Sequence, residues 1–265
     1  MDRVVRCVIA GVGLLGPGLP GWSASRAVLA GEVPWEPVPV ALPPPAALPP
    51  TERRRTSAAV RLALAVSAEA AAASGLAPDS LETVFASSNG DGAVVGSILE
   101  ALTVPGGAIS PTQFHNSVHN AAAGYWGIAM GSMQASVSLG GHDDSFAIGL
   151  VQAAAAVAAR GVPVLFCAYD APLTAPLDAK RFTEAPFAAA LVLVPAGASG
   201  GVPLSVEMAE AEEACSSGLM DPLVAGNPAA RCLPLLRALA AGRAARIGLP
   251  LADGGAVVLD LGAAA

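Results

Sequence analysis

The sequence is poor in lysine and in aromatic residues. Of its 265 residues only Lys180 is a lysine, and phenylalanine, tryptophan and tyrosine together make up 4%. Acidic residues outnumber basic ones by 21 to 14, which gives a net charge of −7 at pH 7. Because proteins that hold nucleic acid need a basic surface to neutralise phosphates, this balance argues against a nucleic-acid partner.

Long uninterrupted apolar runs are also missing, although the chain is 54% hydrophobic and its mean hydropathy is +0.58. A membrane-spanning helix needs about 20 consecutive apolar residues. The best candidate, 149–159, is too short and ends at Arg160. The apolar N-terminal stretch is interrupted by glycine and proline, so it does not match a secretory signal. We therefore expect a cytoplasmic protein without a transmembrane segment.

Paired cysteines are absent. The four cysteines lie far apart with no CxxC spacing, and Cys7 and Cys167 fall inside strand-like apolar runs. Zinc sites and disulfide frameworks need closer or more regular spacing. We therefore expect Cys7 and Cys167 to be small buried hydrophobic residues rather than part of a metal site or disulfide framework; the other two cysteines are Cys215 and Cys232.

One glycine motif resembles a dinucleotide-binding loop. The segment 11–16 reads GVGLLG and follows an apolar run, with Glu32 at a suggestive distance. Dinucleotide binding needs a helix to begin within the motif, so that its backbone amides meet the pyrophosphate. Pro17 and Pro20 follow instead and break such a helix. We expect a tight loop and no cofactor.

Short apolar runs bounded by glycine or proline alternate with helical segments along the chain. This alternation favours an α/β fold with a largely parallel sheet covered by helices. The proline-rich stretch 34–50 can only be extended, and a helix capped by Thr51 is expected to end before Gly75. The predicted strands are 4–11, 83–88, 135–139, 162–169, 188–194, 202–211 (nearer an edge) and 256–261, and the predicted helices are 22–30, 51–74, 92–102, 116–130, 144–160 and 231–241.

Two clusters of polar residues are candidates for chemistry. His115 and His119 are four residues apart, so on a helix they would share one face. With His142 they could ligate a metal, although no glutamate follows His115 as it would in a zinc protease. Asp143 and Asp144 lie between a predicted strand and a long apolar helix. They can serve the helix dipole, or act as general acid and base if their pKa values differ.

The order of several segments resembles the β-ketoacyl synthases. The segments are RVVRCVIAGVGLLGPGLPGW at 3–22, the helix beginning RRRTSAAVRLALA at 53–65, and the stretch 109–155, which contains FHNSVHN and ASVSL. The resemblance covers about 4–194. It implies a thiolase-like, layered α-β-α fold with an abbreviated C-terminal half. We expect a ketosynthase-like N-terminal domain over 1–195 and a shortened C-terminal extension over 196–265, packed on the same sheet.

The departures from that family concern its catalytic groups. The family's nucleophilic cysteine belongs at the turn after the ASVSL strand, where Asp143 or Asp144 stands. The family also draws two histidines and a lysine from its C-terminal half, yet no histidine or lysine follows Lys180. Without these groups, acyl transfer and condensation have no nucleophile and no oxyanion partners. We therefore expect no catalytic residue and no enzyme activity by the chain alone.

A shortened ketosynthase that lacks the nucleophilic cysteine resembles a chain length factor, such as the small ketosynthase-like subunits of aryl polyene pathways. The resemblance implies a heterodimer with an active β-ketoacyl synthase, in which this chain shapes the tunnel for the growing acyl chain in polyene, fatty acid or polyketide-like biosynthesis. The family's acyl carrier protein is acidic, so Arg53, Arg54 and Arg55 are candidates to contact it. The implied interface and tunnel residues are Phe114, His115, Asn116, His119, Asn120, Ser136, Val137 and Ser138.

Two enzymatic alternatives remain open from the sequence. One is a malonyl-thioester decarboxylase or acyl-thioester hydrolase that uses Asp143 or Asp144. The other is a metal-dependent hydrolase that uses His115, His119 and His142.

Overall fold

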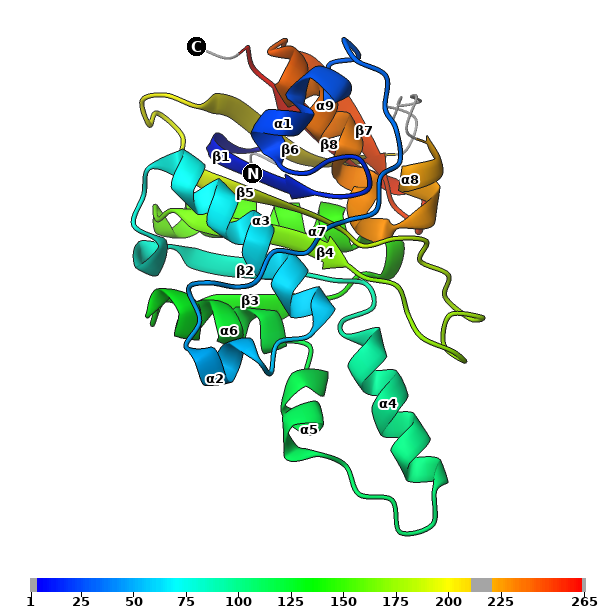
Figure 1. Cartoon of the computed structure of the whole chain (residues 1–265). Coiled ribbons are helices and arrows are strands. Elements are labelled where there is room, and N and C mark those ends of the chain that lie inside the picture. The colour runs from blue at the N-terminus through cyan, green and yellow to red at the C-terminus, as the bar shows by residue number, and fades with distance from the viewer. Residues whose placement is uncertain (1–3, 211–220, 264–265) are drawn as a thin grey trace.

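The computed structural model describes residues 4–210 and 221–263 (Figure 1). Its strands are β1 (Val4–Leu15), β2 (Glu82–Ala86), β3 (Ser136–Leu139), β4 (Val164–Asp170), β5 (Phe187–Pro195), β6 (Val202–Glu210), β7 (Ala245–Pro250) and β8 (Gly255–Leu261). They form an eight-stranded sheet in the order β3-β2-β4-β5-β1-β6-β8-β7. The apolar runs that predicted strands supply its centre, because β4 and β5 are buried on both faces.

The prediction of a largely parallel sheet was wrong. β2 pairs in parallel with β3 and β4, but the other neighbouring pairs of the described sheet are antiparallel. A parallel neighbour needs a crossover connection, usually a helix. The connections from β4 to β5 and from β7 to β8 contain no helix, so these neighbouring strands are antiparallel. β6 was expected near an edge, but it lies between β1 and β8, and the edge strand β7 was not predicted at all.

Helices cover both faces of the sheet, which gives the layered α-β-α, thiolase-like architecture. α3 and α6 lie on one face, while α7, α9 and α1 lie on the other (Figure 1). α4 and α5 extend away from the body beside the β3 end of the sheet. The helices are α1 (Trp22–Leu29), α2 (Pro50–Arg53), α3 (Ala58–Ser74), α4 (Gly92–Thr103), α5 (Pro111–Ser117), α6 (Ala121–Met130), α7 (Ser145–Arg160), α8 (Asp221–Gly226) and α9 (Leu233–Ala241).

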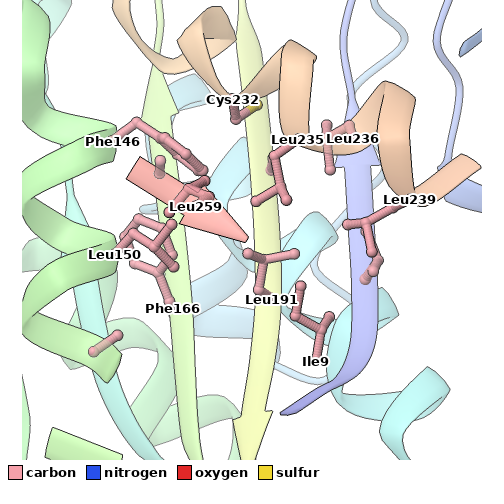
Figure 2. Close-up of a cluster of buried hydrophobic side chains, with 14 of the residues drawn as sticks. Ile9, Phe146, Leu150, Phe166, Leu191, Cys232, Leu235, Leu236, Leu239 and Leu259 are labelled. Carbon is pink, nitrogen blue, oxygen red and sulfur yellow. The ribbon is translucent and has the colours of Figure 1, made fainter. Parts of the chain in front are cut away.

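The core on the α7 side joins the two ends of the chain. Leu191 of β5, Leu150 of α7 and Leu235 of α9 point toward one another, and Leu259 of β8 lies among them (Figure 2). All four are at most 1% exposed. Alternate residues of each strand face the two helix layers, as a period of two requires. The segment after β5 therefore extends the same sheet and shares the same core, while the division into domains at residue 195 stays a prediction.

The glycines of the GVGLLG segment do not form a loop, which corrects the prediction. Gly11 and Gly13 lie inside β1, against α3. A Cβ on Gly11 would lie 2.1 Å from the carbonyl oxygen of Ala70, and one on Gly13 would lie 2.0 Å from that of Val66. Glycine is needed at both positions because the backbone of α3 crosses β1 too closely for any side chain.

Two predicted helices have different limits in the structure. The long helix begins at Ala58 rather than after Thr51, because Ser57 caps it by accepting the N–H of Val60 at 3.2 Å. It ends as predicted before Gly75, whose φ is +71°. The helix predicted over 116–130 is instead α5 and α6, since Val118 adopts an extended conformation between them.

Candidate functional site

The turn between β3 and α7 is where the resemblance aligns the family's nucleophile. Gly141 follows the end of β3, a 3₁₀ turn covers His142–Asp144, and α7 begins at Ser145. The Ser145 hydroxyl donates to the carbonyl of His142 at 2.7 Å and accepts the N–H of Gly141 at 3.0 Å. A Cβ on Gly141 would lie 2.6 Å from Cδ1 of Ile148, so glycine lets this turn fold tightly onto α7.

The Asp143 carboxylate is surrounded by three nitrogen-bearing side chains. Nη2 of Arg181 makes a short ion-paired hydrogen bond to Oδ1. Nδ1 of His142 lies 3.5 Å and Nη2 of Arg231 3.6 Å from Oδ2. Burial raises the pKa of Asp143, but the hydrogen bond from Arg181 and the charges of Arg181, Arg231 and His142 outweigh it and hold the pKa below its usual value. Asp143 is therefore an anion at neutral pH.

Arg181 joins three segments of the chain around this carboxylate. It comes from the loop between β4 and β5, and Nη2 also donates to Oγ of Ser88 at 2.8 Å. Nε donates to Oδ1 of Asn89 at 3.3 Å, and Nη1 lies 3.0 Å from Nε2 of His142. The guanidinium of Arg181 thus connects the β2–α4 loop to the β3–α7 turn. Arginine can do this because its planar guanidinium carries several N–H donors that point in different directions.

Asp144 is held by the C-terminal segment of the chain. Nη1 of Arg231 lies 3.2 Å from Oδ1, and the N–H of Ala252, in the turn between β7 and β8, donates to Oδ2 at 2.9 Å. The side chain is only 11% exposed. Both acids of the turn therefore serve as acceptors in one ion-pair network that spans the sheet.

A second buried carboxylate organises the loop after β2. Asp170 ends β4 and is fully buried, and its Oδ1 accepts the hydroxyl of Ser87 and the N–H groups of Ser88 and Asn89, each at 2.9 Å. Burial raises the pKa of Asp170 to about 6, against the opposing effect of these hydrogen bonds and of the charge of Arg181. Asp170 thus fixes the start of the segment that leads into α4.

The three histidines do not form one site. α5 ends at Ser117, so His115 and His119 do not share a helix face as predicted. His115 packs edge-on against Tyr125 with 6.0 Å between ring centroids. Nε2 of His119 lies 3.1 Å from the carbonyl oxygen of Ser87, and His142 lies with Arg181 and Asp143. Within residues 4–210 and 221–263 no three His, Cys, Asp or Glu side chains gather where they could hold a metal ion.

None of the cysteines in the described ranges lies at the β3–α7 turn. Cys7, Cys167 and Cys232 are buried and are not bonded to one another. Burial raises the pKa of Cys7 and of Cys167 to about 12 and raises that of Cys232 as well. A thiol in such surroundings is not a nucleophile at neutral pH. Cys215 lies outside the described residues.

The residues that the resemblance assigns to an interface gather at the β3 end of the sheet. Phe114 is 65% exposed, and His115, His119, Asn120 and Ser136 are exposed as well. Val137 and Ser138 are half-buried on opposite faces of β3. Asn116 is only 4% exposed and faces inward, where Nδ2 donates to the carbonyl of Arg55 at 2.7 Å and Oδ1 accepts the hydroxyl of Tyr125 at 3.0 Å. Its role in the chain is thus to fix α5 against α6.

Large apolar side chains are exposed around the same end of the molecule. Met133, in the loop before β3, is 96% exposed, and Ile128 of α6 is 47% exposed. Within the described sheet β3 pairs only with β2, which leaves its other edge unpaired. Exposed apolar residues near an open strand edge are typical of an interaction surface. The apolar set is Leu99, Leu102, Val104, Phe114, Val118, Ile128, Met133 and Ile148.

The three arginines proposed to contact a carrier protein lie in and after α2, not in the first turn of the long helix. All three are exposed. Nη2 of Arg53 donates to the carbonyls of Ala46 and Leu48 at 2.8 and 3.0 Å, and Arg55 pairs with Glu52 at 3.3 Å. The side chain of Arg54 makes no hydrogen bond or ion pair with the part of the chain that the structure describes, so its charge is available.

The sequence did not single out Arg181, Arg231 or Asp170. Arg181 stands in an irregular loop and Arg231 in a 3₁₀ turn at the start of a predicted helix, neither within a motif, and each lies at least 38 residues from the acid it meets. The only signal was negative: no histidine or lysine follows Lys180, so the arginines beyond it are the cations left to approach the turn. Asp170 directly follows the predicted strand 162–169, and α/β proteins often place functional residues at the carboxyl ends of strands, so its position could have identified it.

Within the described residues no helix is both long and apolar enough to cross a membrane. A mixed sheet between helix layers, with an elaborated turn at the N-terminus of the central helix α7, defines a protein of the thiolase-like class. Residues 22–245 match the model of the β-ketoacyl synthase N-terminal domain, and the chain belongs to that family. No protein of curated function matches the sequence.

Solved structures with this fold include complexes of ketosynthases with chain length factors. A chain of the complex of the ketosynthase ApeO with its chain length factor ApeC from Xenorhabdus doucetiae is 22% identical with a TM-score of 0.73, over 97% of this chain and 99% of that one. A chain of the ishigamide ketosynthase/chain length factor is 16% identical with a TM-score of 0.74, over 98% of this chain and 100% of that one.

One related structure has a longer chain. A β-ketoacyl synthase from Burkholderia phymatum is 16% identical with a TM-score of 0.59, and the match covers 91% of this chain but only 71% of that one. This chain is therefore shorter than that relative, as the resemblance implies.

Proposed function

We propose that this protein is a non-catalytic, chain-length-factor type subunit that pairs with an active β-ketoacyl synthase in the cytoplasm. In the pair it shapes the tunnel that holds the growing acyl chain in polyene, fatty acid or polyketide-like biosynthesis. The observation that carries the proposal is the ion-paired Asp143 at the turn where the family's nucleophile aligns.

The surroundings of Asp143 and Asp144 suit neither nucleophilic nor acid–base catalysis. A general acid or base works best with a pKa near the operating pH and with free access to the substrate. The pKa of Asp143 is lowered, and its oxygens meet Arg181, Arg231 and His142. Asp144 is occupied by Arg231 and the N–H of Ala252. This argues against the decarboxylase and hydrolase alternatives, and the scattered histidines give the metal-dependent hydrolase no support.

The exposed apolar residues support a partner at the β3 end of the sheet. Phe114, Ile128 and Met133 stand around the unpaired edge of β3, and burial of such side chains stabilises an association by about 1.5–3 kcal/mol each when complete. The protruding α4 and α5 would enlarge the contact (Figure 1). An active ketosynthase is the partner that the family resemblance implies, and one related structure is a ketosynthase in complex with its chain length factor.

The C-terminal extension has a structural role in this proposal. Arg231 and Ala252 reach the β3–α7 turn from the half of the chain that, in an active relative, would supply histidines. We propose that residues 196–265 hold this turn closed around Asp143 and Asp144. Carrier-protein contact through Arg54, flanked by Arg53 and Arg55, is a further part of the proposal, since an acidic partner would seek unpaired positive charge.

Co-expression with the active ketosynthase tests the proposal. Size-exclusion chromatography with mass determination is expected to give a stable 1:1 complex. Two separate, independently soluble peaks would contradict it.

A separate assay tests the absence of catalysis. The isolated chain is expected to leave malonyl and acyl thioesters of a carrier protein intact over hours. Turnover that Asp143→Asn or Asp144→Asn abolishes would replace the proposal with the decarboxylase or hydrolase alternative.

A further inference from the structure

A cavity lies beneath the proline-rich segment that links α1 to α2. This segment, 34–45, is called the proline strap here; it has no regular secondary structure (Figure 1). The cavity has a volume of about 840 Å³ and is bounded by the strap, α1, α3 and the end of β1. Small-molecule sites in proteins typically have about 300–1,000 Å³. None of its lining residues belongs to the exposed apolar set near β3, so the cavity is a separate site.

The strap is fastened at both ends and free in the middle. At one end the carbonyl of Val38 accepts the N–H of Gly18 at 2.9 Å. At the other, Nη2 of Arg53 donates to the carbonyl of Ala46 at 2.8 Å. Within the described ranges, residues 39–44 make no hydrogen bond to the rest of the chain. Three of these six residues are prolines, which lack an N–H and fix φ, so the strap stays extended rather than collapsing into the cavity.

The walls of the cavity are aliphatic. Leu14 of β1, Val28 of α1 and Val38 of the strap are among the lining residues, and no aromatic side chain of the described residues lines it. An aromatic ligand would gain no ring contacts there, whereas a flexible hydrocarbon chain can pack against such walls. The cavity therefore favours a ligand with an aliphatic body.

One carboxylate lies at the wall of this cavity. Glu69 of α3 is half-buried; its Oε2 accepts the N–H of Leu14 at 2.9 Å, and its Oε1 accepts the N–H of Trp22 at 2.6 Å. A carboxylate offers about four acceptor positions, so these two bonds leave acceptor capacity unused. A Cβ on Gly21, another lining residue, would lie 3.2 Å from Oε1. Glycine at this position therefore leaves that side of the carboxylate uncovered.

No cation of the described chain neutralises Glu69. Within residues 4–210 and 221–263 it forms no ion pair with lysine, arginine or histidine, and no basic residue there lines the cavity. The other ionisable lining residue, Glu36, is also an acid. A carboxylate or phosphate ligand would be repelled by both acids. An ammonium group would be attracted, and it donates charge-assisted hydrogen bonds, which are roughly twice as strong as neutral ones.

We propose that this cavity binds a protonated primary aliphatic amine. The ammonium group lies at Glu69, where it takes the acceptor positions that the N–H groups of Leu14 and Trp22 leave open. The hydrocarbon chain extends beneath the strap, against Val28 and Val38. The site is independent of the proposed function, because it involves neither the edge of β3 nor the β3–α7 turn.

Isothermal titration calorimetry of the full chain at pH 7 tests the class of ligand. Decylamine, 1-decanol and decanoate share one chain length and differ in charge. Decylamine is expected to bind with 1:1 stoichiometry and about tenfold or more tighter than 1-decanol, and decanoate is expected to bind most weakly. Absence of decylamine binding, or an affinity no higher than that of 1-decanol, would overturn the proposal.

A pair of substitutions on α3 tests whether the amine occupies the cavity. Ala65→Trp fills the cavity from its wall, whereas Ala68→Trp, at an exposed position outside the lining, is the matched control. Ala65→Trp is expected to weaken decylamine binding about tenfold or more, and Ala68→Trp to leave it unchanged. Equal affinities of the two variants would show that the amine binds elsewhere on this acidic chain, and the site would be overturned.

Glu69→Gln tests the position of the ammonium group. The variant keeps an acceptor oxygen but carries no charge, so its affinity for decylamine is expected to fall to that for 1-decanol. Glu32→Gln, at an exposed acid that does not line the cavity, controls for the change in net charge. If Glu69→Gln binds decylamine as tightly as Glu32→Gln, the assignment to Glu69 is overturned. Should Glu69→Gln fail to fold, the comparison of ligands and the Ala65→Trp variant still decide.

Discussion

Nη1 of Arg231 lies 3.2 Å from Oδ1 of Asp144, although the two residues are 87 positions apart in the chain. The contact joins the C-terminal segment to the turn that immediately precedes α7. Because the N–H of Ala252 approaches the other oxygen of the same carboxylate at 2.9 Å, two parts of that segment meet at one acid. The abbreviated half of the fold is thus anchored where the family's chemistry would occur.

Removal of the Arg231 guanidinium is expected to destabilise the fold. In Arg231→Met the Asp144 carboxylate, only 11% exposed, keeps the N–H of Ala252 but loses its cation. We expect a loss of about 1–3 kcal/mol in the free energy of unfolding, measured by urea denaturation at pH 7. Arg54→Met, at an exposed arginine outside this network, is the control. Equal stability of the two variants would contradict the anchoring role.

The sequence predicted the parts of the site that are local in the chain. Asp143 and Asp144 could be recognised because they stand between a strand and a helix, and the end of α3 because Gly75 marks it. The cations Arg181 and Arg231 could not be predicted, because no local pattern encodes a contact made across the sheet. Because Arg181 and Arg231 pair with Asp143 and Asp144, these two acids are ion-paired hydrogen-bond acceptors rather than free catalytic groups.

The arrangement of the strands was less predictable than the strands themselves. Burial on both faces makes β4 and β5 recognisable as apolar runs, but the same pattern is also typical of parallel sheets and so predicts the wrong pairing for β5. β5 is antiparallel to both its neighbours, and it is buried all the same because α3 and α7 cover its two faces. The role of Gly11 and Gly13 could not be predicted either, because no sequence pattern indicates that α3 packs closely against β1 at these positions.

Asp170 is expected to make the protein less stable as the pH rises from about 4 to 6. Its pKa is raised from 3.8 to about 6, so the folded chain binds more protons than the unfolded chain in this interval. Stability therefore falls as the pH rises through it, by about 3 kcal/mol in order of magnitude. Asp170→Asn keeps an oxygen for Ser87, Ser88 and Asn89 but carries no charge, so it is expected to lack this fall.

Urea denaturation of both proteins at several pH values between 4 and 7 measures the difference. Asp79→Asn, at an exposed acid, is the control and is expected to follow the wild type. A constant difference between wild type and Asp170→Asn across this range would show that Asp170 does not titrate there.

Exposed apolar side chains near β3 are expected to govern partner binding. Ile128→Glu and Met133→Glu place charge at residues that are 47% and 96% exposed, so the subunit should fold normally. Burying an unpaired carboxylate at an interface should weaken the complex about a hundredfold or more, measured by titration of the labelled subunit. Met208→Glu, at a 49% exposed position on β6, should bind like the wild type.

Val137→Arg is also expected to abolish partner binding, but it is a less selective test. Val137 packs against the core beneath α7, so the charge would disturb the subunit as well as the interface. Binding by Ile128→Glu and Met133→Glu as tight as by Met208→Glu would mean that the partner lies elsewhere.

Asp143→Cys is expected to create a reactive thiol without creating a condensing enzyme. Arg181, Arg231 and His142 would favour the thiolate and lower the pKa of the new cysteine. Rapid alkylation by iodoacetamide at pH 7, followed by mass spectrometry, checks this in a Cys215→Ser background. Condensation should stay absent, since no histidine or lysine follows Lys180. Measurable condensation by the variant alone would show that the chain keeps hidden catalytic groups.

Gly13→Ala is expected to be among the most damaging single substitutions in β1. The new Cβ would lie 2.0 Å from the carbonyl oxygen of Val66, and neither backbone can give way without separating α3 from the sheet. We expect a loss of about 3 kcal/mol or more in the free energy of unfolding. Gly124→Ala is the matched control, because its Cβ meets open space and a helix favours alanine by about 1 kcal/mol. If both variants unfold at the same urea concentration, close packing of α3 on β1 is not the reason for the glycine.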